Sequence, residues 1–135
     1  FIIIEAPPGV DEYCALRTKC GLAPRSEESA RVGLPRALYS VTLRSGEKLI
    51  AMGRVVGDLG CHVQITDIAV DQEFQGQGLG RMVMERIMSF IHQNVPRTCF
   101  VNLFADVDFL YQKFGFVQTT KAKGMYLDWT TVDSR

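Results

Sequence analysis

Three closely spaced glycines, between an apolar run and an amphipathic run, most constrain how this chain folds. The letters QGQGLG occupy residues 75–80, after the apolar stretch 65–70 and at the start of the amphipathic stretch 79–91. This order predicts a strand, a tight loop and a helix in immediate succession. Glycines permit positive φ values and let a ligand approach the backbone, and the first N–H groups of a helix lack intrahelical partners. The segment therefore predicts a loop that binds a phosphate group.

The glycine spacing excludes two common phosphate-binding loops. A Walker loop requires Lys and then Ser or Thr after its last glycine, but Arg81 and Met82 follow Gly80. A dinucleotide-binding loop requires Gly-x-Gly-x-x-Gly and an acidic residue about 20 positions later. Here the spacing is Gly-x-Gly-x-Gly and position 100 is Phe. The chain is therefore neither a typical ATP or GTP hydrolase nor a typical dinucleotide-dependent enzyme.

Length and composition favour one globular domain over residues 1–135, since domains commonly contain about 100 to 150 residues. A hydrophobic fraction of 47% without a long apolar run opposes both disorder and a membrane span. Fifteen basic and fifteen acidic residues leave no net charge, which argues against a general nucleic-acid binder. We therefore expect a small-molecule partner, and neither nucleic acid nor a membrane.

The cysteine pattern predicts no metal site. No Cys-x-x-Cys pair occurs, and only two His residues are available as further ligands, so plain buried thiols are the simpler interpretation. The four cysteines are Cys14, Cys20, Cys61 and Cys99. The apolar run 1–4 is too short for a secretion signal and has no basic leader. A cytoplasmic location is the expectation that follows.

Hydrophobic periodicity predicts strands and helices along the chain. The expected strands are residues 1–5, 38–43, 48–56, 61–70, 99–104 and 125–129, and the expected helices are one capped by Asp11, one started by Ser26, and residues 79–91 and 109–114. A helix crosses between the strands 61–70 and 99–104, which makes these two strands parallel. The strands 38–43 and 48–56 flank a turn and are expected to pair as an antiparallel hairpin.

Two segments together resemble the Gcn5-related N-acetyltransferase (GNAT) family. Gln75, Gly78 and Gly80 match its acyl-coenzyme A loop, which is Gln or Arg, two residues, Gly, any residue, then Gly or Ala. The letters LYQKFGF at 110–116 resemble its recurrent Phe-Tyr-Glu-Lys-x-Gly-Phe segment. The resemblance extends from about residue 11 to residue 129. It implies the acyl-CoA N-acyltransferase fold, of class α/β (α+β), with a mixed, mostly antiparallel central sheet, a parallel strand pair and flanking helices.

The resemblance also implies a reaction and a cofactor. The acetyl group would move from acetyl-coenzyme A to a primary amine of a small molecule, by direct attack in a ternary complex. The strand end would pair with the pantetheine arm, and the loop amides would bind the pyrophosphate. The expected cofactor-binding residues are Ile68, Ala69, Val70, Gln75, Gly76, Gln77, Gly78, Leu79, Gly80, Arg81 and Lys113. For Lys113, simple solvent exposure is the alternative.

Tyr111 and Asp67 are the expected catalytic residues. Tyr111 occupies the family's position for the general acid near the coenzyme sulfur, and a phenol with a reference pKa near 10 is protonated at neutral pH. The alternative is a core tyrosine whose hydroxyl binds the backbone. Asp67 precedes the residues that pair with the cofactor and could take a proton from the substrate ammonium, directly or through water. Its alternative role is to bind a backbone N–H at a bulge.

Two positions depart from the family pattern. Gln64 stands where some histone-acetylating members carry a glutamate base, and glutamine cannot accept the proton. Phe104 stands where many members carry Asn, so an apolar face could close that half of the cofactor cleft. Three acidic residues, Asp67, Asp106 and Asp108, would suit a cationic amine. A non-catalytic acyl-CoA sensor or interaction module, acetylation of a protein or peptide amine, and a homodimer all stay open.

Overall fold

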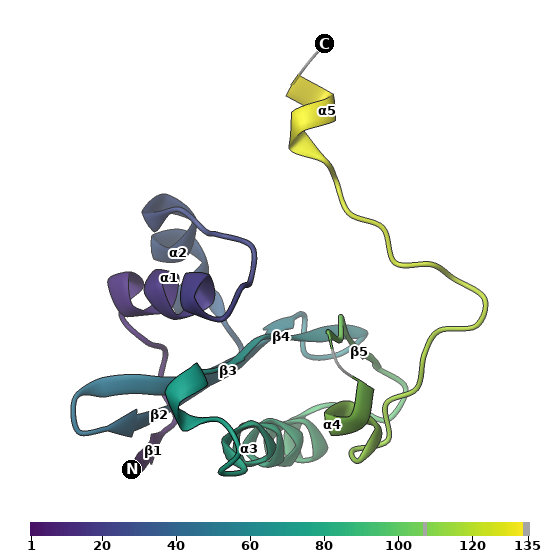
Figure 1. Ribbon diagram of the computed structural model, residues 1–135. Coiled ribbons are helices and arrows are strands. Elements are labelled where there is room, and N and C mark those ends of the chain that lie inside the picture. The colour runs from purple at the N-terminus through teal and green to yellow at the C-terminus, as the bar shows by residue number, and fades with distance from the viewer. Residues whose placement is uncertain (107, 134–135) are drawn as a thin grey trace.

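A five-stranded mixed sheet forms the centre of the protein (Figure 1). The structure is a computed structural model that describes residues 1–106 and 108–133. The strands are β1 (Ile2–Ile4), β2 (Tyr39–Ser45), β3 (Lys48–Gly57), β4 (His62–Val70) and β5 (Phe100–Leu103), in that spatial order. Neighbouring strands are antiparallel except β4 and β5, which are parallel. The predicted mixed sheet with one parallel pair is therefore confirmed.

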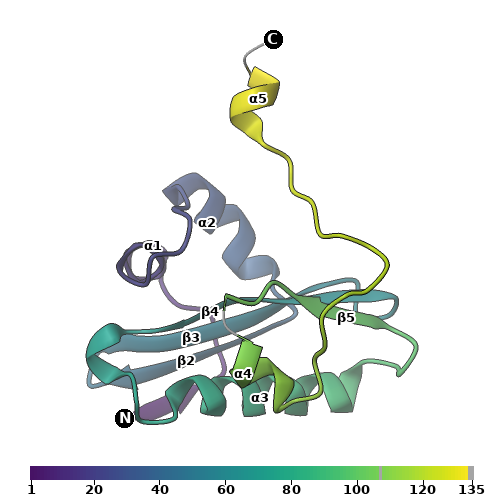
Figure 2. The same cartoon turned by 45° about the vertical axis from the view of Figure 1, so that its right-hand side comes forward.

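Helices cover both faces of this sheet (Figures 1 and 2). One face carries α1 (Val10–Lys19), α2 (Glu27–Gly33) and the 3-10 helix η1 (Leu34–Arg36), and the other carries α3 (Leu79–Asn94) and α4 (Asp108–Gln112). The 3-10 helix η2 (Gln72–Phe74) precedes the glycine loop, and α5 (Trp129–Asp133) ends the described chain. The helix predicted at 109–114 is observed as α4, which begins one residue earlier and ends two residues earlier than predicted. Gly115, with φ +92°, follows its last turn.

Two apolar clusters hold the layers together. The larger cluster lies between the sheet and α3, which buries Val83 and Ile87 against it. A Cβ at Gly53 of β3 would lie 2.6 Å from both Ile68 Cδ1 and Val83 Cγ1, so only glycine lets the helix pack this closely. The smaller cluster joins α1 and α2 to the opposite face of the sheet. The sheet is therefore buried on both sides where the site is formed.

The first two helices begin in different ways. Ser26 caps α2, because its hydroxyl accepts a hydrogen bond from the Ser29 N–H at 3.0 Å, as predicted. The prediction that Asp11 caps α1 is wrong, since the N-cap is Gly9 and Asp11 lies in the first turn. Glu12 accepts a hydrogen bond from the Gly9 N–H at 2.7 Å and so holds the helix start. An acidic residue is favourable in the first turn of a helix as well as at its N-cap, so Asp11 alone did not locate the cap.

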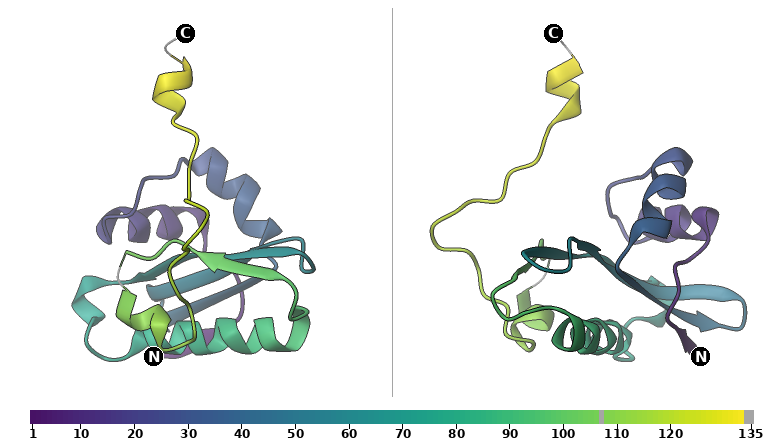
Figure 3. Two further views of the ribbon diagram at one scale, coloured as in Figure 1. Left: turned by 90° about the vertical axis from the view of Figure 1, so that its right-hand side faces the viewer. Right: turned by 180° about the vertical axis from the view of Figure 1, so that it is seen from behind.

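The predicted closing strand 125–129 is wrong. The sheet ends at β5, and the part of the chain after residue 116 that the structure describes contributes no strand to it. Residues 117–128 instead leave the body beside α4, pass β5, and turn away to α5 (Figure 3). Among the described residues, no helix is both long and apolar enough to cross a membrane.

All four cysteines are free thiols, as expected, but they are not all buried. Cys61 is exposed and the other three are half-buried. Within residues 1–106 and 108–133, no group of three His, Cys, Asp or Glu side chains could hold a metal ion.

Candidate active site

The parallel strands β4 and β5 separate halfway along β4. Their pairing joins His62–Ile65 to Phe100–Leu103. In residues 66–70 of β4, only Thr66, Ala69 and Val70 are paired, and only with β3. The outer edge of this half of β4 has no strand partner among the described residues. Ile68, Ala69 and Val70 lie in this half, so their position suits pairing with an extended ligand.

The glycine loop connects this open edge to α3. Gly76 and Gly78 have φ values of +83° and +78°, in the region that favours glycine. A Cβ built on either would have no neighbour within 4 Å, so the space beside both residues is open. Gly78 is the N-cap of α3 and no side chain caps the helix. The N–H groups of residues 79–81 are therefore available to an anion.

Other loop residues contribute mainly through the backbone. Leu79 is buried in the core. A Cβ at Gly80 would lie 3.5 Å from Leu110 Cδ2, an ordinary contact, so this position has room for alanine but little more. The Arg81 side chain is exposed and its Nε lies 3.3 Å from Glu85 Oε1, while Gln77 is exposed. These side chains therefore leave the backbone N–H groups of the loop accessible to a ligand.

Val70 has one backbone group that is already engaged. Its carbonyl oxygen accepts hydrogen bonds from Cys20 Sγ and Gln75 Nε2, both at 3.3 Å. A carbonyl oxygen has two lone pairs, so any ligand contact with Val70 is expected through its N–H. The Gln75 side chain thereby ties the glycine loop to the end of β4.

Asp67 is the centre of a buried charged cluster. It is 7% exposed, has φ +61°, and lies opposite a register shift between Met52 and Arg54 of β3. Its Oδ1 accepts a hydrogen bond from Arg17 Nη1. Its Oδ2 accepts hydrogen bonds from the Tyr13 hydroxyl at 2.9 Å and from Arg54 Nε. The bulge predicted as the alternative is present, but side chains rather than a backbone N–H bind the carboxylate.

This cluster joins β4 to the α1–α2 connection. Arg17 also donates to the Ala23 carbonyl oxygen, from Nε at 3.0 Å and from Nη2 at 2.7 Å. Burial and the charge of Asp67 raise the pKa of Tyr13, so this phenol remains a hydrogen-bond donor. The two positive charges of Arg17 and Arg54 lie against the single negative charge of the Asp67 carboxylate. Asp67 therefore does not present the free negative charge that we expected to suit a cationic amine.

Tyr111 lies on α4, half-buried against the larger core cluster. Its hydroxyl makes no hydrogen bond to any residue that the structure describes, unlike the core tyrosine of the alternative interpretation. Burial and, to a smaller extent, the charge of Asp106 raise its pKa above the usual value of 10. The side chain lines a hollow of ≈ 750 Å³ together with Gln64 and Asn102. Tyr111 is thus a protonated phenol with an unengaged hydroxyl.

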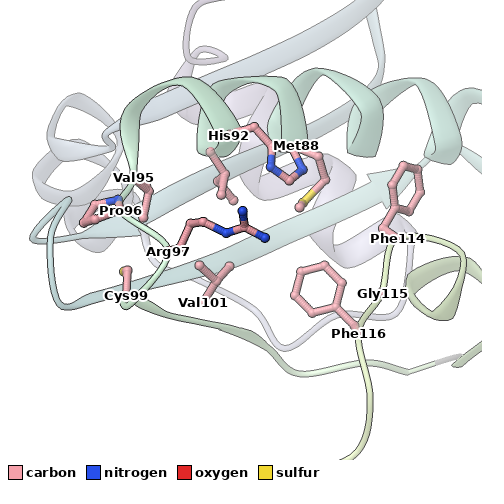
Figure 4. A pocket seen from close by; sticks show the side chains of 11 residues that line it. Met88, His92, Val95, Pro96, Arg97, Cys99, Val101, Phe114, Gly115 and Phe116 are labelled. Atoms are coloured by element: carbon pink, nitrogen blue, oxygen red, sulfur yellow. The ribbon is translucent and has the colours of Figure 1, made fainter.

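A second hollow lies at the opposite end of α3 from the glycine loop (Figure 4). It has a volume of ≈ 550 Å³ and is lined mainly by apolar side chains of α3, β5 and the segment after α4. Arg97 points into it from the α3–β5 connection, and Phe116 lies across from α3 (Figure 4). Because it is remote from the loop and from the open half of β4, it is separate from the candidate site.

Comparison with known proteins decides the family. The model of the family described as "Acetyltransferase (GNAT) domain" matches residues 37–118, which is more than half of the chain. The chain belongs to the GNAT acetyltransferase family. The match contains β3, β4, the glycine loop and α4, and so covers the elements that form the site.

Individual relatives agree with this assignment. An uncharacterized N-acetyltransferase, ycf52, from Porphyra purpurea is 33% identical over 113 residues, which cover 78% of this chain and 64% of the relative. GCN5-related N-acetyltransferase 2, chloroplastic, from Arabidopsis thaliana is 39% identical over 84 residues, covering 59% and 31%. The match thus spans less than two thirds of these curated relatives. A "Probable Acetyltransferase" crystal structure from meticillin-resistant Staphylococcus aureus is 44% identical, with a TM-score of 0.90, covering 94% and 98%.

Sequence reasoning missed the partners of Asp67 and a polar network in this GNAT domain. Gln64 Nε2 donates to Asn102 Oδ1 at 3.2 Å, and Asn102 Nδ2 lies 3.1 Å from His62 Nε2. Alternation of polar residues at 62 and 64 was an available signal. No sequence signal pointed to Arg17 and Arg54, because their contact with Asp67 depends on how α1 packs on the sheet.

Two further expected residues are exposed. Phe104 is 72% exposed and lines the hollow of ≈ 750 Å³ beside Tyr111, so the expectation that an apolar face closes that half of the cofactor cleft stays a prediction. Lys113 is exposed and its Nζ lies 6.0 Å from the centre of the Phe109 ring. The side chain of Asp108 lies outside the described side chains.

Proposed function

We propose that this protein is an acetyl-coenzyme A-dependent N-acetyltransferase that acetylates a primary amine of a small molecule. The observation that carries the proposal is the unpaired half of β4, which leads directly into an open glycine loop at the start of α3. An extended arm with a pyrophosphate at one end is the ligand shape that such an edge and loop suit together. Family membership supports the acetyl group as the part that is transferred.

In this proposal the donor is bound mostly by backbone groups. The pantetheine arm lies along Ile68, Ala69 and Val70 as an added strand would. The pyrophosphate accepts hydrogen bonds from the loop and from the first N–H groups of α3, where the helix dipole favours negative charge. Arg81 and Lys113 are exposed, so they contribute long-range attraction to the phosphates rather than fixed contacts.

The reaction is a direct attack of the neutral amine on the thioester carbonyl. A carbon–nitrogen bond forms, the carbon–sulfur bond breaks, and a backbone N–H of β4 stabilises the negative charge on the carbonyl oxygen, worth about 3 kcal/mol for a well-aimed donor. Tyr111 donates its phenolic proton to the departing sulfur, and the proton that the nitrogen loses after the attack returns, directly or through water, to the Tyr111 phenolate. Its unengaged hydroxyl supports this role, and its raised pKa keeps the phenol protonated at neutral pH.

Asp67 is the proposed acceptor of the proton that the ammonium form of the substrate loses. A carboxylate has about four lone-pair sites, and three are used by Tyr13, Arg17 and Arg54. Transfer through one bound water is therefore more consistent with these contacts than direct transfer. If Asp67 serves only to neutralise the amine, raising the pH above the pKa of that amine restores the rate of an Asp67→Asn variant.

Calorimetric titration with acetyl-coenzyme A tests the donor site. The protein is expected to bind with a micromolar dissociation constant, and Gly78→Asp to weaken binding more than about a hundredfold, because a like charge about 4 Å from a phosphate costs several kcal/mol at an effective dielectric constant near 20. Gly46→Asp is the matched control. Gly46 also has a positive φ, +61°, and nothing within 4 Å of its Cβ position, but it lies in the β2–β3 turn.

The outcomes separate the alternatives. Absence of binding by the unaltered protein, or equal binding by the Gly78→Asp variant, contradicts the donor site. A thiol-release assay with a panel of small amines and short peptides then tests the acceptor. Binding without amine-dependent release from any of them favours an acyl-CoA sensor, and release with peptides alone favours a protein substrate.

A further inference from the structure

The hollow of ≈ 550 Å³ at the far end of α3 is a concave surface that the proposed acetyl transfer does not use (Figure 4). Its lining is mainly apolar: Met88 and Ile91 come from α3, Val101 from β5, and Phe116 from the segment after α4. Sites for small molecules commonly have volumes of about 300 to 1,000 Å³ and are lined by apolar side chains with a few polar groups. This hollow has that size and that kind of lining.

Arg97 supplies the polar group. Its guanidinium extends from the α3–β5 connection toward the middle of the hollow (Figure 4). No residue that the structure describes accepts a hydrogen bond from it or pairs with its charge. The arginines of α3 differ in this respect. Arg81 Nε lies 3.3 Å from Glu85 Oε1, and Arg86 Nη1 lies 3.4 Å from Glu5 Oε1. A guanidinium has five N–H donors in a planar fork, and those of Arg97 are available to a ligand.

The hollow has positive charge without a compensating carboxylate. None of the residues that line it is Asp or Glu, and His92 of α3 adds a second nitrogen side chain beside Arg97. Within the described chain, the His92 imidazole also has no hydrogen-bond partner. A guanidinium binds a carboxylate through two parallel hydrogen bonds, and apolar surroundings strengthen the attraction between the charges. The lining therefore suits an anionic group joined to an apolar body.

The end of α3 favours a carboxylate over a phosphate as this anionic group. The hollow lies at the C-terminal end of the helix, where Val95 is the C-cap. The helix dipole places a partial negative charge at this end, which opposes a doubly charged phosphate more than a singly charged carboxylate. We propose that the hollow binds an apolar monocarboxylic acid, with its carboxylate on Arg97 and its body against Met88, Val101 and Phe116.

Phe114 and Phe116 connect the hollow to α4. Both residues line it, and their N–H groups donate to the Tyr111 carbonyl oxygen, at 2.9 and 3.2 Å. An acid that packs against these residues therefore restrains the turn that ends α4. The binding itself does not depend on acetyl transfer, because the hollow is remote from the glycine loop and from the open half of β4.

Calorimetric titration of the full chain with decanoate tests the site. The unaltered protein is expected to bind one decanoate. Decanol is expected to bind at least about tenfold more weakly, because it cannot form the charged pair with Arg97. Acetate, which lacks the apolar body, is expected to show no measurable binding. Arg97→Gln removes the charge and is expected to weaken decanoate binding at least about tenfold. Coenzyme A is expected not to displace decanoate, which separates this site from the proposed donor site.

Arg36→Gln is the matched control, because Arg36 is an exposed arginine of η1 on the opposite face of the sheet. Its substitution is expected to leave decanoate affinity unchanged. Absence of decanoate binding by the unaltered protein overturns the proposal, and so does equal affinity for decanol or displacement by coenzyme A. Equal affinities of the two arginine variants also overturn it, because the attraction is then not specific to Arg97. The titrations of the unaltered protein are decisive even if the Arg97 variant does not fold.

Discussion

The glycine loop and the Asp67 cluster lie along the same strand and its exit, but they are built in opposite ways. At the loop, Gly76 and Gly78 have open space beside them and the helix start has no side-chain cap. At the cluster, both carboxylate oxygens of Asp67 are already bound by side chains of α1 and β3. One region keeps its hydrogen-bonding groups available, and the other has used them within the protein.

This difference separates binding from stability. A ligand gains most from groups that have no protein partner, because no hydrogen bond has to be broken to bind it. A buried ion pair is costly to break, because removal of one member leaves the other charge uncompensated. Substitutions in the loop are therefore expected to change ligand binding strongly, and to lower the free energy of unfolding only by the roughly 1–2 kcal/mol that a side chain costs at a positive φ. Substitutions in the cluster are expected to do the reverse.

Asp67→Asn is the substitution with the largest expected effect, and it tests whether the cluster stabilises the folded protein. Asn keeps the size of the side chain and tolerates the positive φ of +61° at this position, so the variant removes mainly the charge. The side chains of Arg17 and Arg54 are only 6% and 17% exposed and would lose their counter-charge. The free energy of unfolding is expected to fall by about 3–5 kcal/mol, measured by urea denaturation.

Glu85→Gln is the control for the loss of one carboxylate. It removes the exposed partner of Arg81, 3.3 Å away, and is expected to cost no more than about 0.5 kcal/mol. Similar losses for the two variants would show that the Asp67 cluster is not an important part of the stability. If Asp67→Asn also weakens acetyl-coenzyme A binding strongly, the separation of binding from stability fails.

Tyr111→Phe examines a side chain that resembles the loop in having an unengaged polar group. Because its hydroxyl has no partner among the described residues, its removal is expected to leave stability unchanged. If Tyr111 is the general acid, turnover falls by about a hundredfold or more while the dissociation constant of acetyl-coenzyme A stays the same. Single-turnover kinetics with a responsive amine measure this change at the chemical step.

Tyr39→Phe is the control for loss of a phenol. Its hydroxyl donates to Glu5 Oε1 at 2.9 Å, away from the loop, so turnover is expected to be unaffected. Unchanged turnover in the Tyr111 variant, with chemistry limiting the rate, would make Tyr111 a packing residue.

The loop was predictable from the sequence because its function depends on local backbone geometry. Three glycines lie between an apolar strand and an amphipathic helix, and two of them, Gly76 and Gly78, adopt positive φ values directly before the helix starts. These local features need no reference to the rest of the chain. The parallel order of β4 and β5 was predictable in the same way, since the intervening helix sets the direction of the second strand.

The cluster and the end of the chain were not predictable, because they depend on contacts between distant segments. Arg17 and Asp67 are 50 positions apart, and no periodicity or spacing connects them. The apolar run 125–129 reads as a strand, but its hydrogen bonds depend on an edge that the sequence does not specify. The structure leaves both that edge and that run unpaired within the described chain.

Asp71 allows a comparison between two buried carboxylates, and its substitution is expected to have the smallest effect on stability. Like Asp67 it is a buried carboxylate, 1% exposed, but its partners are the more exposed Lys19 and Lys48, at 2.9 and 3.6 Å. The hydrogen bond from Lys19 lowers the pKa of Asp71 in the folded protein, whereas an unfolded Asp has a pKa near 3.9. The ionised form is thus stabilised by folding, and this contribution is lost as the pH falls from about 4 through the lower folded pKa.

Asp71→Asn keeps a residue that can still cap η2 and removes the charge. The variant is expected to be less stable than the unaltered protein by up to about 1 kcal/mol at pH 7, because pairs with exposed lysines contribute little. Urea denaturation at pH 7 and at about pH 3 measures whether the difference shrinks in acid. A loss as large as that of Asp67→Asn, or one that does not depend on pH, would contradict the view that guanidinium partners and burial distinguish the two carboxylates.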